Sequence, residues 1–309
     1  MSTPTLSSTT PADAAPARPD QPLLPMAILG TGEALPRRVV TTAEVAARCG
    51  LPADEAEQRS GVLTRHWISP DEDPLDLGVA AARSALADAG LTIADIDCVL
   101  NASGTPMQAI PDGGALLAAE LGMAPTKSAY SVHGTCLSFL FALREAALLI
   151  AHGSARHVLI VSTEAGSRGL NFAQPESALL IGDAAAAVVV GPAQRPGQGL
   201  VRSSFITVTS GVEDARIRGF GTRIPIEEAS ERLTDFKFDM QGIRLLASAI
   251  RAFPKFLEDF EPGLSSGLGD TIAAGIPLTL HRARIQPGER LLLVGSGAGT
   301  HFGALLVQN

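Results

Sequence analysis

Short apolar runs alternate with helix-like segments over residues 26–193, and this alternation constrains the fold more than any other feature of the chain. Apolar runs that we interpret as strands occupy residues 26–30, 96–103, 128–132, 157–163 and 184–191. Helical spacing of apolar residues, or a long apolar segment, predicts helices over residues 74–90, 113–121 and 136–152. Strands and helices that alternate at this length favour a layered α/β sheet.

A second unit follows a linker rich in proline and glycine, GPAQRPGQG. A strand is expected at residues 200–210, and helices at 240–257 and 271–284. Residues 290–299 and 301–307 are expected to form a strand, a glycine turn and a second strand. The order of elements resembles that of the first unit, which indicates an internal duplication. We therefore divide the chain into a first half, residues 26–193, and a second half, residues 194–309.

The second half is the shorter one. In the first half, the helix that ends at Gly90 leads through a short connector to a buried strand. In the second half, a similar connector at residues 265–270 leads directly into a helix. We predict that a strand–helix segment is missing at the join between Asp270 and Thr271.

Composition narrows the class of protein. Hydrophobic residues make up 46% of the 309 residues, and the net charge of −8 argues against a nucleic-acid surface. The three cysteines form no CxxC pair, which is typical of a reducing, cytoplasmic location. Residues 1–25 lack the features of a signal peptide and are predicted to be a disordered tail. No apolar run predicts a membrane span, and no histidine spacing predicts a metal site.

The segment SAYSVHGTCLSFLFAL, residues 128–143, carries the strongest chemical signal. A strand enters a tight turn, and Cys136 opens a long helix. Free N–H groups and the dipole at a helix N-terminus stabilise a thiolate. Such a thiolate can take an acyl group as a thioester, and the N–H groups can stabilise the oxyanion of the tetrahedral intermediate. The alternative is that Cys136 is a small core residue.

Several segments together resemble 3-oxoacyl-[acyl-carrier-protein] synthase III and its relatives in the thiolase superfamily. They are ILGTGEALPRRVVTTAEV (28–45), SGVLTRHW (60–67), the segment around Cys136, LLIGDAAAAVVV (179–190) and GIPLTLHRARIQPGERLLLVGSGAGTHFGALLV (275–307). The resemblance implies a thiolase-like, five-layered α/β/α/β/α fold of two duplicated halves, and a homodimer. It also implies that Cys136 accepts an acyl group from acyl-CoA, with the N–H groups of Cys136 and Gly299 as the oxyanion hole. Acyl-CoA and acyl-carrier-protein thioesters are then substrates, and no cofactor is expected.

One departure from the family separates two half-reactions. Condensing members use a histidine and an asparagine to stabilise the enolate that forms when a malonyl thioester loses carbon dioxide. Neither of their segments is present. Gly-Asp-Thr at residues 269–271 could be a degenerate form of the family's Gly-Asn-Thr turn, but we favour a join between Asp270 and Thr271 that removes both residues. If the 309 residues are the whole polypeptide, loading is expected to survive and condensation to be lost or very slow. A thioesterase or other acyltransferase, a non-catalytic partner with the same fold, and a sequence that omits a segment of the real protein remain alternatives.

Other motifs are weaker. GSGAG (295–299) and GTGEAL (30–35) are interpreted as tight turns rather than dinucleotide sites, and GLSSG (263–267) lacks the preceding strand of a nucleophile elbow. Arg37, Arg65 and Arg244, together with Arg38, could hold a CoA phosphate or an acidic carrier protein. His281 is expected on a helix surface and His133 in a turn, and no histidine is assigned as a base.

Overall fold

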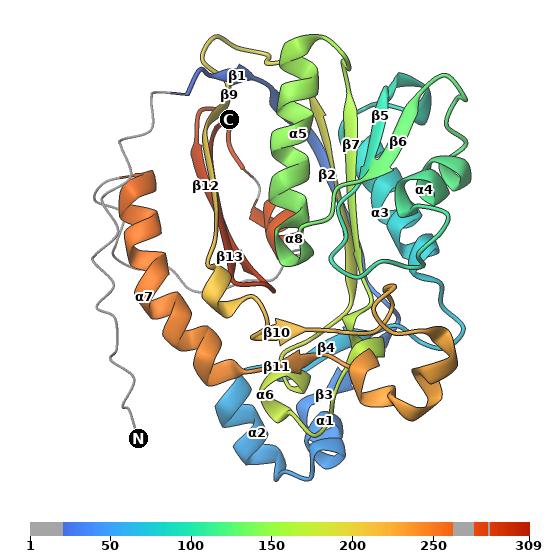
Figure 1. Cartoon of the computed structure of the whole chain (residues 1–309). Coiled ribbons are helices and arrows are strands. Elements are labelled where there is room, and N and C mark those ends of the chain that lie inside the picture. Colours follow the sequence, from blue (N-terminus) through green and yellow to red (C-terminus); the bar gives the residue numbers. More distant parts are fainter. Residues whose placement is uncertain (1–20, 262–274, 284) are drawn as a thin grey trace.

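The computed structural model describes residues 21–261, 275–283 and 285–309. Figure 1 shows five layers: an outer helix, a sheet, a central pair of helices, a second sheet and an outer pair of helices. In that order the helices are α7 (Gly242–Phe260), then α5 (Ser138–His152) with α8 (Gly275–Ala283), then α3 (Pro74–Asp88) with α4 (Gly113–Leu121). The five-layered α/β/α/β/α arrangement predicted from the sequence is confirmed.

The first half builds a five-stranded sheet with the order β2-β8-β7-β5-β6. Its strands are β2 (Ala27–Ala34), β5 (Cys98–Asn101), β6 (Ser128–Ser131), β7 (Val158–Glu164) and β8 (Ala184–Gly191). β2, β8 and β7 pair antiparallel, whereas β5 pairs parallel with both β7 and β6. The carboxyl ends of three parallel strands therefore meet at one edge, which is where ligands commonly bind in α/β sheets.

Two glycines let α3 pack directly on β2. A methyl group at Gly30 would lie 2.4 Å from the Ala89 nitrogen, and one at Gly32 would lie 2.4 Å from the Ala81 oxygen. The predicted turn at residues 30–35 is therefore wrong, and the strand continues to Ala34. These glycines serve close packing of a helix on a strand rather than a reversal of the chain.

The second half, together with one strand from the predicted tail, builds a sheet with the order β1-β9-β13-β12. Its strands are β1 (Leu24–Pro25), β9 (Gly199–Thr207), β12 (Arg290–Gly297) and β13 (His301–Gln308), all of them antiparallel to their neighbours. The predicted tail at residues 1–25 is wrong at its end, because Leu24 pairs with Leu200. Residues 1–20 lie outside the described part of the chain.

The central layer joins the two halves. One hydrophobic cluster contains Leu140 and Leu143 of α5 together with Val188 of β8 and Leu305 of β13. All four side chains are fully buried, so α5 packs against both sheets. The segment Thr135–His152 is apolar and long enough to span a membrane by composition, but its central place between the sheets is that of a core helix.

α7 covers the outer face of the second sheet with only part of its length. Phe256 and Phe260 pack against Phe302 and Leu306 of β13. The helix passes through Pro254 and ends three residues beyond the predicted limit. Nearer its start, three apolar side chains one or two turns apart are exposed: Ile243 at 88%, Leu246 at 61% and Ile250 at 65%.

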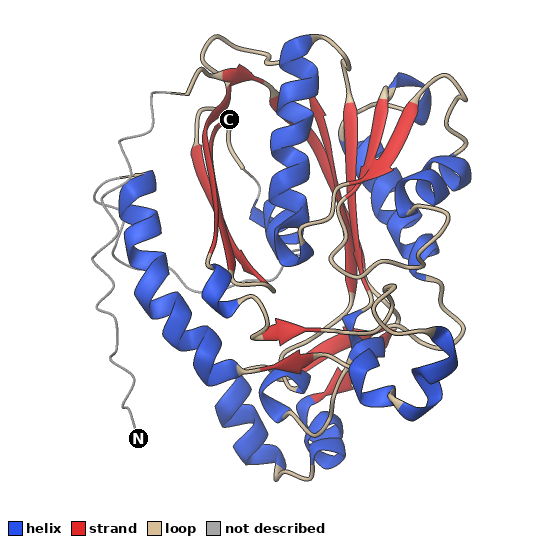
Figure 2. Ribbon diagram, in the orientation of Figure 1, coloured by secondary structure: helices blue, strands red, loops and turns tan. Residues whose placement is uncertain are grey.

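The remaining elements form a smaller region, which lies below the two sheets in Figure 1 and Figure 2. They are β3 (Arg38–Thr41), α1 (Thr42–Cys49), α2 (Ala53–Ser60), β4 (Thr64–Trp67), α6 (Pro175–Ala178), β10 (Ala215–Arg216) and β11 (Asp239–Met240). β3 pairs with β4, and Trp67 packs with Val40 and Leu179 in a core of its own.

Part of the predicted second half cannot be compared. The helix expected over residues 271–284 is α8 where it is described. The proposed join between Asp270 and Thr271, and the GLSSG segment, lie outside the described residues.

Candidate functional site

Cys136 lies in a short 3₁₀ turn, Thr135–Leu137, that precedes α5. The prediction that Cys136 opens the α-helix is thus wrong by two residues, because the turn closes by a bond from the Leu137 N–H to the Gly134 oxygen, 3.0 Å apart. Thr135 has φ of 50°, a left-handed conformation that β-branched residues rarely adopt. Backbone strain of this kind is commonly found at functional sites.

Ser138 closes the turn around this strained residue. Its hydroxyl lies 2.6 Å from the Thr135 oxygen and 3.3 Å from the Ser103 oxygen, and it accepts the Gly134 N–H at 3.0 Å. Ser138 is fully buried. The turn that carries Cys136 is therefore fixed from within and against the loop that follows β5.

The turn between β12 and β13 meets the Cys136 turn from the second half. The Thr135 hydroxyl donates to the Ala298 oxygen at 3.1 Å. A methyl group at Gly297 would lie 3.6 Å from the Cys136 nitrogen, so the two main chains are close. The structure thus brings together two segments that are 160 positions apart in the sequence.

Gly299 occupies this second turn with a left-handed φ of 86°. A methyl group there would lie 2.6 Å from Nε2 of His301, whose Nδ1 is 2.9 Å from the Thr207 hydroxyl. The next residue, Thr300, is also left-handed, with its hydroxyl donating to the Gly211 oxygen at 2.8 Å. Two main-chain turns, one from each half, consequently lie side by side at Cys136.

Glu164 is a buried carboxylate beside this site that the sequence did not reveal. It ends β7 and accepts three bonds, from the Gly104 nitrogen at 2.6 Å, the Thr105 nitrogen at 3.0 Å and the Thr105 hydroxyl at 2.9 Å. Burial raises the pKa of Glu164 to about 7, and the nearby Asp183 carboxylate adds to the rise, against the three hydrogen bonds. A charged residue at the end of a strand that begins with four apolar residues was the available signal.

The predicted arginines have separate partners. Arg37 is exposed and pairs with Asp71 and Glu72. Arg244 is exposed and lies 3.7 Å from Asp214.

Arg65 contradicts its predicted role on a binding surface. It is only 5% exposed, and it donates to the Thr42 hydroxyl and the Leu179 oxygen at 2.9 and 2.8 Å. Burial lowers the pKa of Arg65. The side chain points into the core of the small region because β4 turns this face inward.

The histidines do not gather. His66 lies 2.6 Å from the Pro36 oxygen, His152 lies 2.7 Å from the Ser154 hydroxyl, and His157 lies 3.0 Å from the Asp95 oxygen. The exposed His133 lies 3.3 Å from the Ser103 oxygen. His281 is half-buried against Thr31 of β2, not on the surface as expected, because α8 packs in the central layer. Within the described ranges, no group of three or more His, Cys, Asp or Glu residues could hold a metal ion.

Cys49 and Cys98 are poor rivals to Cys136. None of the three cysteines forms a disulfide bond. Burial raises the pKa of both the Cys49 and the Cys98 thiols, which disfavours the nucleophilic thiolate.

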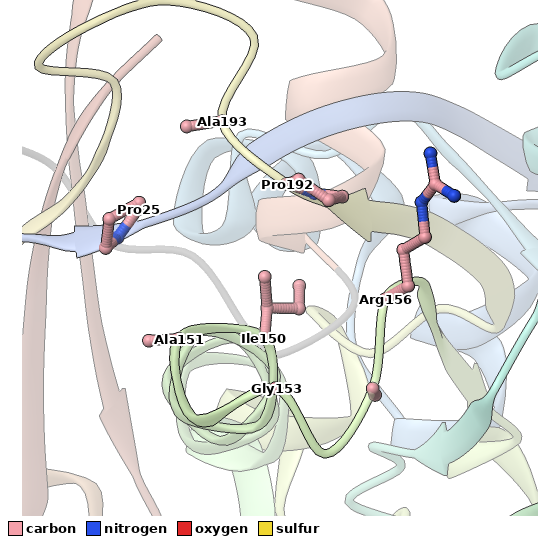
Figure 3. Close-up of a pocket in the computed structure, with 8 residues that line it drawn as sticks. Pro25, Ile150, Ala151, Gly153, Arg156, Pro192 and Ala193 are labelled. Atoms are coloured by element: carbon pink, nitrogen blue, oxygen red, sulfur yellow. The ribbon is translucent and has the colours of Figure 1, made fainter.

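An open hollow of about 460 Å³ lies at the other end of α5, far along the helix from Cys136 (Figure 3). Ile150, Ala151 and Gly153 line one side, and Pro25, Pro192 and Ala193 line another. Arg156 is the charged side chain at its rim. Its lining offers no nucleophile or acid–base pair.

The chain is similar in sequence to several acyl-carrier-protein synthases. The model of the 3-oxoacyl-[acyl-carrier-protein (ACP)] synthase III family matches residues 130–208, which include Cys136. A beta-ketoacyl-[acyl-carrier-protein] synthase III of Rhodospirillum rubrum is 32% identical over 91% of this chain and 98% of its own length. A 3-oxopimeloyl-[acyl-carrier-protein] synthase of Brucella abortus is also 32% identical, with the same coverage.

A solved structure of 3-oxoacyl-(acyl-carrier-protein) synthase III superposes with a TM-score of 0.82 at 22% identity, covering 92% of this chain and 100% of that one. The alignment with the Rhodospirillum rubrum protein spans 325 positions, whereas 91% of 309 residues is about 281, so about 44 positions face gaps in this chain. The fold is thiolase-like, and the chain belongs to the 3-oxoacyl-[acyl-carrier-protein] synthase III family of acyl-transferring condensing enzymes.

Proposed function

We propose that Cys136 accepts an acyl group from acyl-CoA. The Cys136 thiol gives up its proton and its sulfur attacks the thioester carbonyl carbon. The bond from that carbon to the CoA sulfur then breaks, and CoA takes up a proton and leaves as a thiol. The N–H groups of Cys136 and Gly299 stabilise the intermediate oxyanion. The observation that supports this most directly is the contact between the Cys136 turn and the Gly297–Gly299 turn.

The partners follow from the names of the relatives. The names of both curated relatives include acyl-carrier protein. We therefore propose that an acyl carrier protein carries the malonyl group that would accept the acyl group from Cys136. Of the three predicted arginines, Arg37 and Arg244 remain candidates for contact with CoA or the carrier, because they are exposed. A homodimer in the cytoplasm, with no cofactor, remains the expectation from the sequence.

We propose further that this chain loads an acyl group but condenses it poorly. The family's enolate-stabilising histidine and asparagine have no counterpart that we find in the sequence. The alignment gaps agree with a loss of sequence from within the chain. Among the described residues, β12 pairs with a strand on one side only, which agrees with the loss of a strand from the second half.

Loading is tested by incubating the protein with acetyl-, hexanoyl- and lauroyl-CoA and measuring intact mass. We expect one acyl group per chain on wild type and none on Cys136→Ala. Peptide mapping should place the group on Cys136. An unmodified but correctly folded wild type would favour a non-catalytic partner, and an adduct that persists in Cys136→Ala would contradict the assignment.

Condensation is tested on the loaded protein with a malonyl thioester of acyl carrier protein. We expect no 3-oxoacyl product above background. Efficient turnover would overturn this part of the proposal, and release of free acid would indicate a thioesterase. The intact mass of the protein from its natural source, compared with 31.9 kDa, shows whether a segment is missing from the sequence.

A further inference from the structure

We propose that Glu164 is a positioning residue for Cys136, acting through the Gly104–Thr105 loop on which the nucleophile's turn rests. This inference deepens the proposed acyl loading and rests on it. In this proposal Glu164 does not contact the substrate but fixes the conformation of the turn that carries Cys136.

The first link joins Glu164 to the loop. The carboxylate accepts hydrogen bonds from the consecutive N–H groups of Gly104 and Thr105 and from the Thr105 hydroxyl. The Thr105 hydroxyl also accepts the Ala165 N–H at 3.0 Å. The loop after β5 is therefore tied to the end of β7 by four hydrogen bonds, with each polar group of Thr105 except its carbonyl engaged.

The second link joins the loop to the nucleophile's turn. A methyl group at Gly104 would lie 3.1 Å from the Thr135 oxygen, so the loop and the strained residue are in main-chain contact. The oxygen of the preceding Ser103 faces the hydroxyl of Ser138 at 3.3 Å. Movement of the loop would therefore shift Thr135, and with it the adjoining N–H of Cys136.

A third set of contacts holds the same loop from beneath. The Ser103 hydroxyl accepts the Thr163 N–H at 2.9 Å and donates to Asn101 at 2.7 Å, and Asn101 donates to Ser131 at 2.8 Å. These residues end, or follow, the three parallel strands. Glu164 is the ionisable member of this polar layer, and Asp183 is the charged group that acts on it.

The same sheet supplies a matched control. Asp97 precedes β5 at the opposite end and accepts the N–H groups of Arg156 and His157 at 2.8 and 3.2 Å. It also pairs with Lys127. Asp97 thus links the amino ends of β5 and β7, just as Glu164 links their carboxyl ends. Unlike Glu164, Asp97 lies at the end of the sheet away from Cys136.

The experiment compares wild type, Glu164→Gln and Asp97→Asn in the rate of acylation of Cys136 by acetyl-CoA from pH 5.5 to 8.5. In Glu164→Gln one oxygen is replaced by an NH₂ group, which cannot accept an N–H, so either the Gly104 bond or the Thr105 bonds are lost. We expect acylation to fall by about tenfold or more above pH 7, because a displaced reacting group costs rate steeply. The difference should narrow towards pH 6, where Glu164 is protonated in wild type. Asp97→Asn should keep the rate and pH profile of wild type.

Equal rates and pH profiles in wild type and Glu164→Gln would overturn the inference, even with a lower melting temperature. If wild type forms no acyl adduct, the proposed function fails separately, and the pH profile of Cys136 alkylation by iodoacetamide becomes the test. An unchanged profile in Glu164→Gln then contradicts the positioning role. If Glu164→Gln does not fold, Thr105→Ala should lower the rate and Thr105→Ser should restore it; equal rates in these two would count against the role.

Discussion

In the sheet of the first half, β7 is followed by β5 and then β6, and α4 connects these two strands. In the sheet of the second half, β12 occupies the position that corresponds to β7, and no described strand pairs with its other side. The remaining pairings agree, since β2-β8-β7 and β9-β13-β12 are both antiparallel. The first half thus has parallel strands whose ends support Cys136. The second half contributes a turn to the same site but, where it is described, no such edge. The parallel strands of the first half therefore hold the nucleophile in place, and the described part of the second half has no equivalent strands that could hold residues for the proposed condensation step.

The largest effect should come from the helix that the two halves share. Leu140 of α5 is fully buried between the sheets. Leu140→Ala should lower the free energy of unfolding by about 4 kcal/mol. Urea denaturation should show one transition for both halves, and two separate transitions would show that the halves are independent. Leu148→Ala, at a position 45% exposed on the same helix, is the control and should cost far less.

Glu164 should give the first half a dependence of stability on pH. Burial, the largest cause, raises its pKa from 4.5 to about 7, so the folded chain holds a proton that the unfolded chain releases. Stability from this group is present below pH 4.5 and is lost as pH rises to about 7. The loss should be about 3 kcal/mol relative to Glu164→Gln. Urea denaturation of both proteins across this range measures it, and parallel curves would contradict the raised pKa.

Gly299 tests what the second half contributes to the site. Gly299→Ala places a methyl group 2.6 Å from His301 Nε2 at a left-handed residue, so the His301 ring or the turn must shift, and the backbone is strained. Loss of one oxyanion donor should slow acylation about 100-fold, which equals about 2.7 kcal/mol. Gly288→Ala has a similar φ of 90° but open space around it. Equal acylation by the two variants would remove Gly299 from the oxyanion hole.

The smallest effect is expected on α7. Ile243 and Ile250 are exposed, whereas the corresponding outer helix of the first half, α3, packs against α4 through residues such as Val79 and Leu117. Ile243→Ser and Ile250→Ser should change the free energy of unfolding by less than about 0.5 kcal/mol each. A loss above about 1 kcal/mol, together with a smaller sedimentation coefficient, would show that this stripe is covered in solution by another chain.

Much of the fold could be predicted because the strands of the first half are apolar on both faces. β7 and β8 are buried almost throughout, and such runs are readily recognised as central strands. Errors arose where glycine or pairing decided the outcome. Gly30 and Gly32 were interpreted as a turn because helix packing on a strand cannot be seen in a local pattern. Leu24 was assigned to the tail because its partner, Leu200, is distant in sequence.

The site was predictable to a lesser extent. Cys136 and Gly299 stand in recognisable turns, and the structure places those turns together. Their catalytic roles stay predictions. Glu164 was missed because its significance depends on Gly104 and Thr105, about sixty positions earlier. Arg65 was misplaced because an arginine that the fold buries looks the same in sequence as one that it exposes.

The one-sided pairing of β12 also bears on the behaviour of the chain in concentrated solution. Within the described residues, this strand, RLLLVGSG, offers main-chain donors and acceptors along its outer side, with Leu291, Leu292 and Val294 only partly buried. Strand edges of this kind are templates for pairing between molecules, and charged residues usually protect them. Here Glu289 and Arg290 stand at one end only. We therefore expect the tendency of the protein to aggregate to depend on this edge.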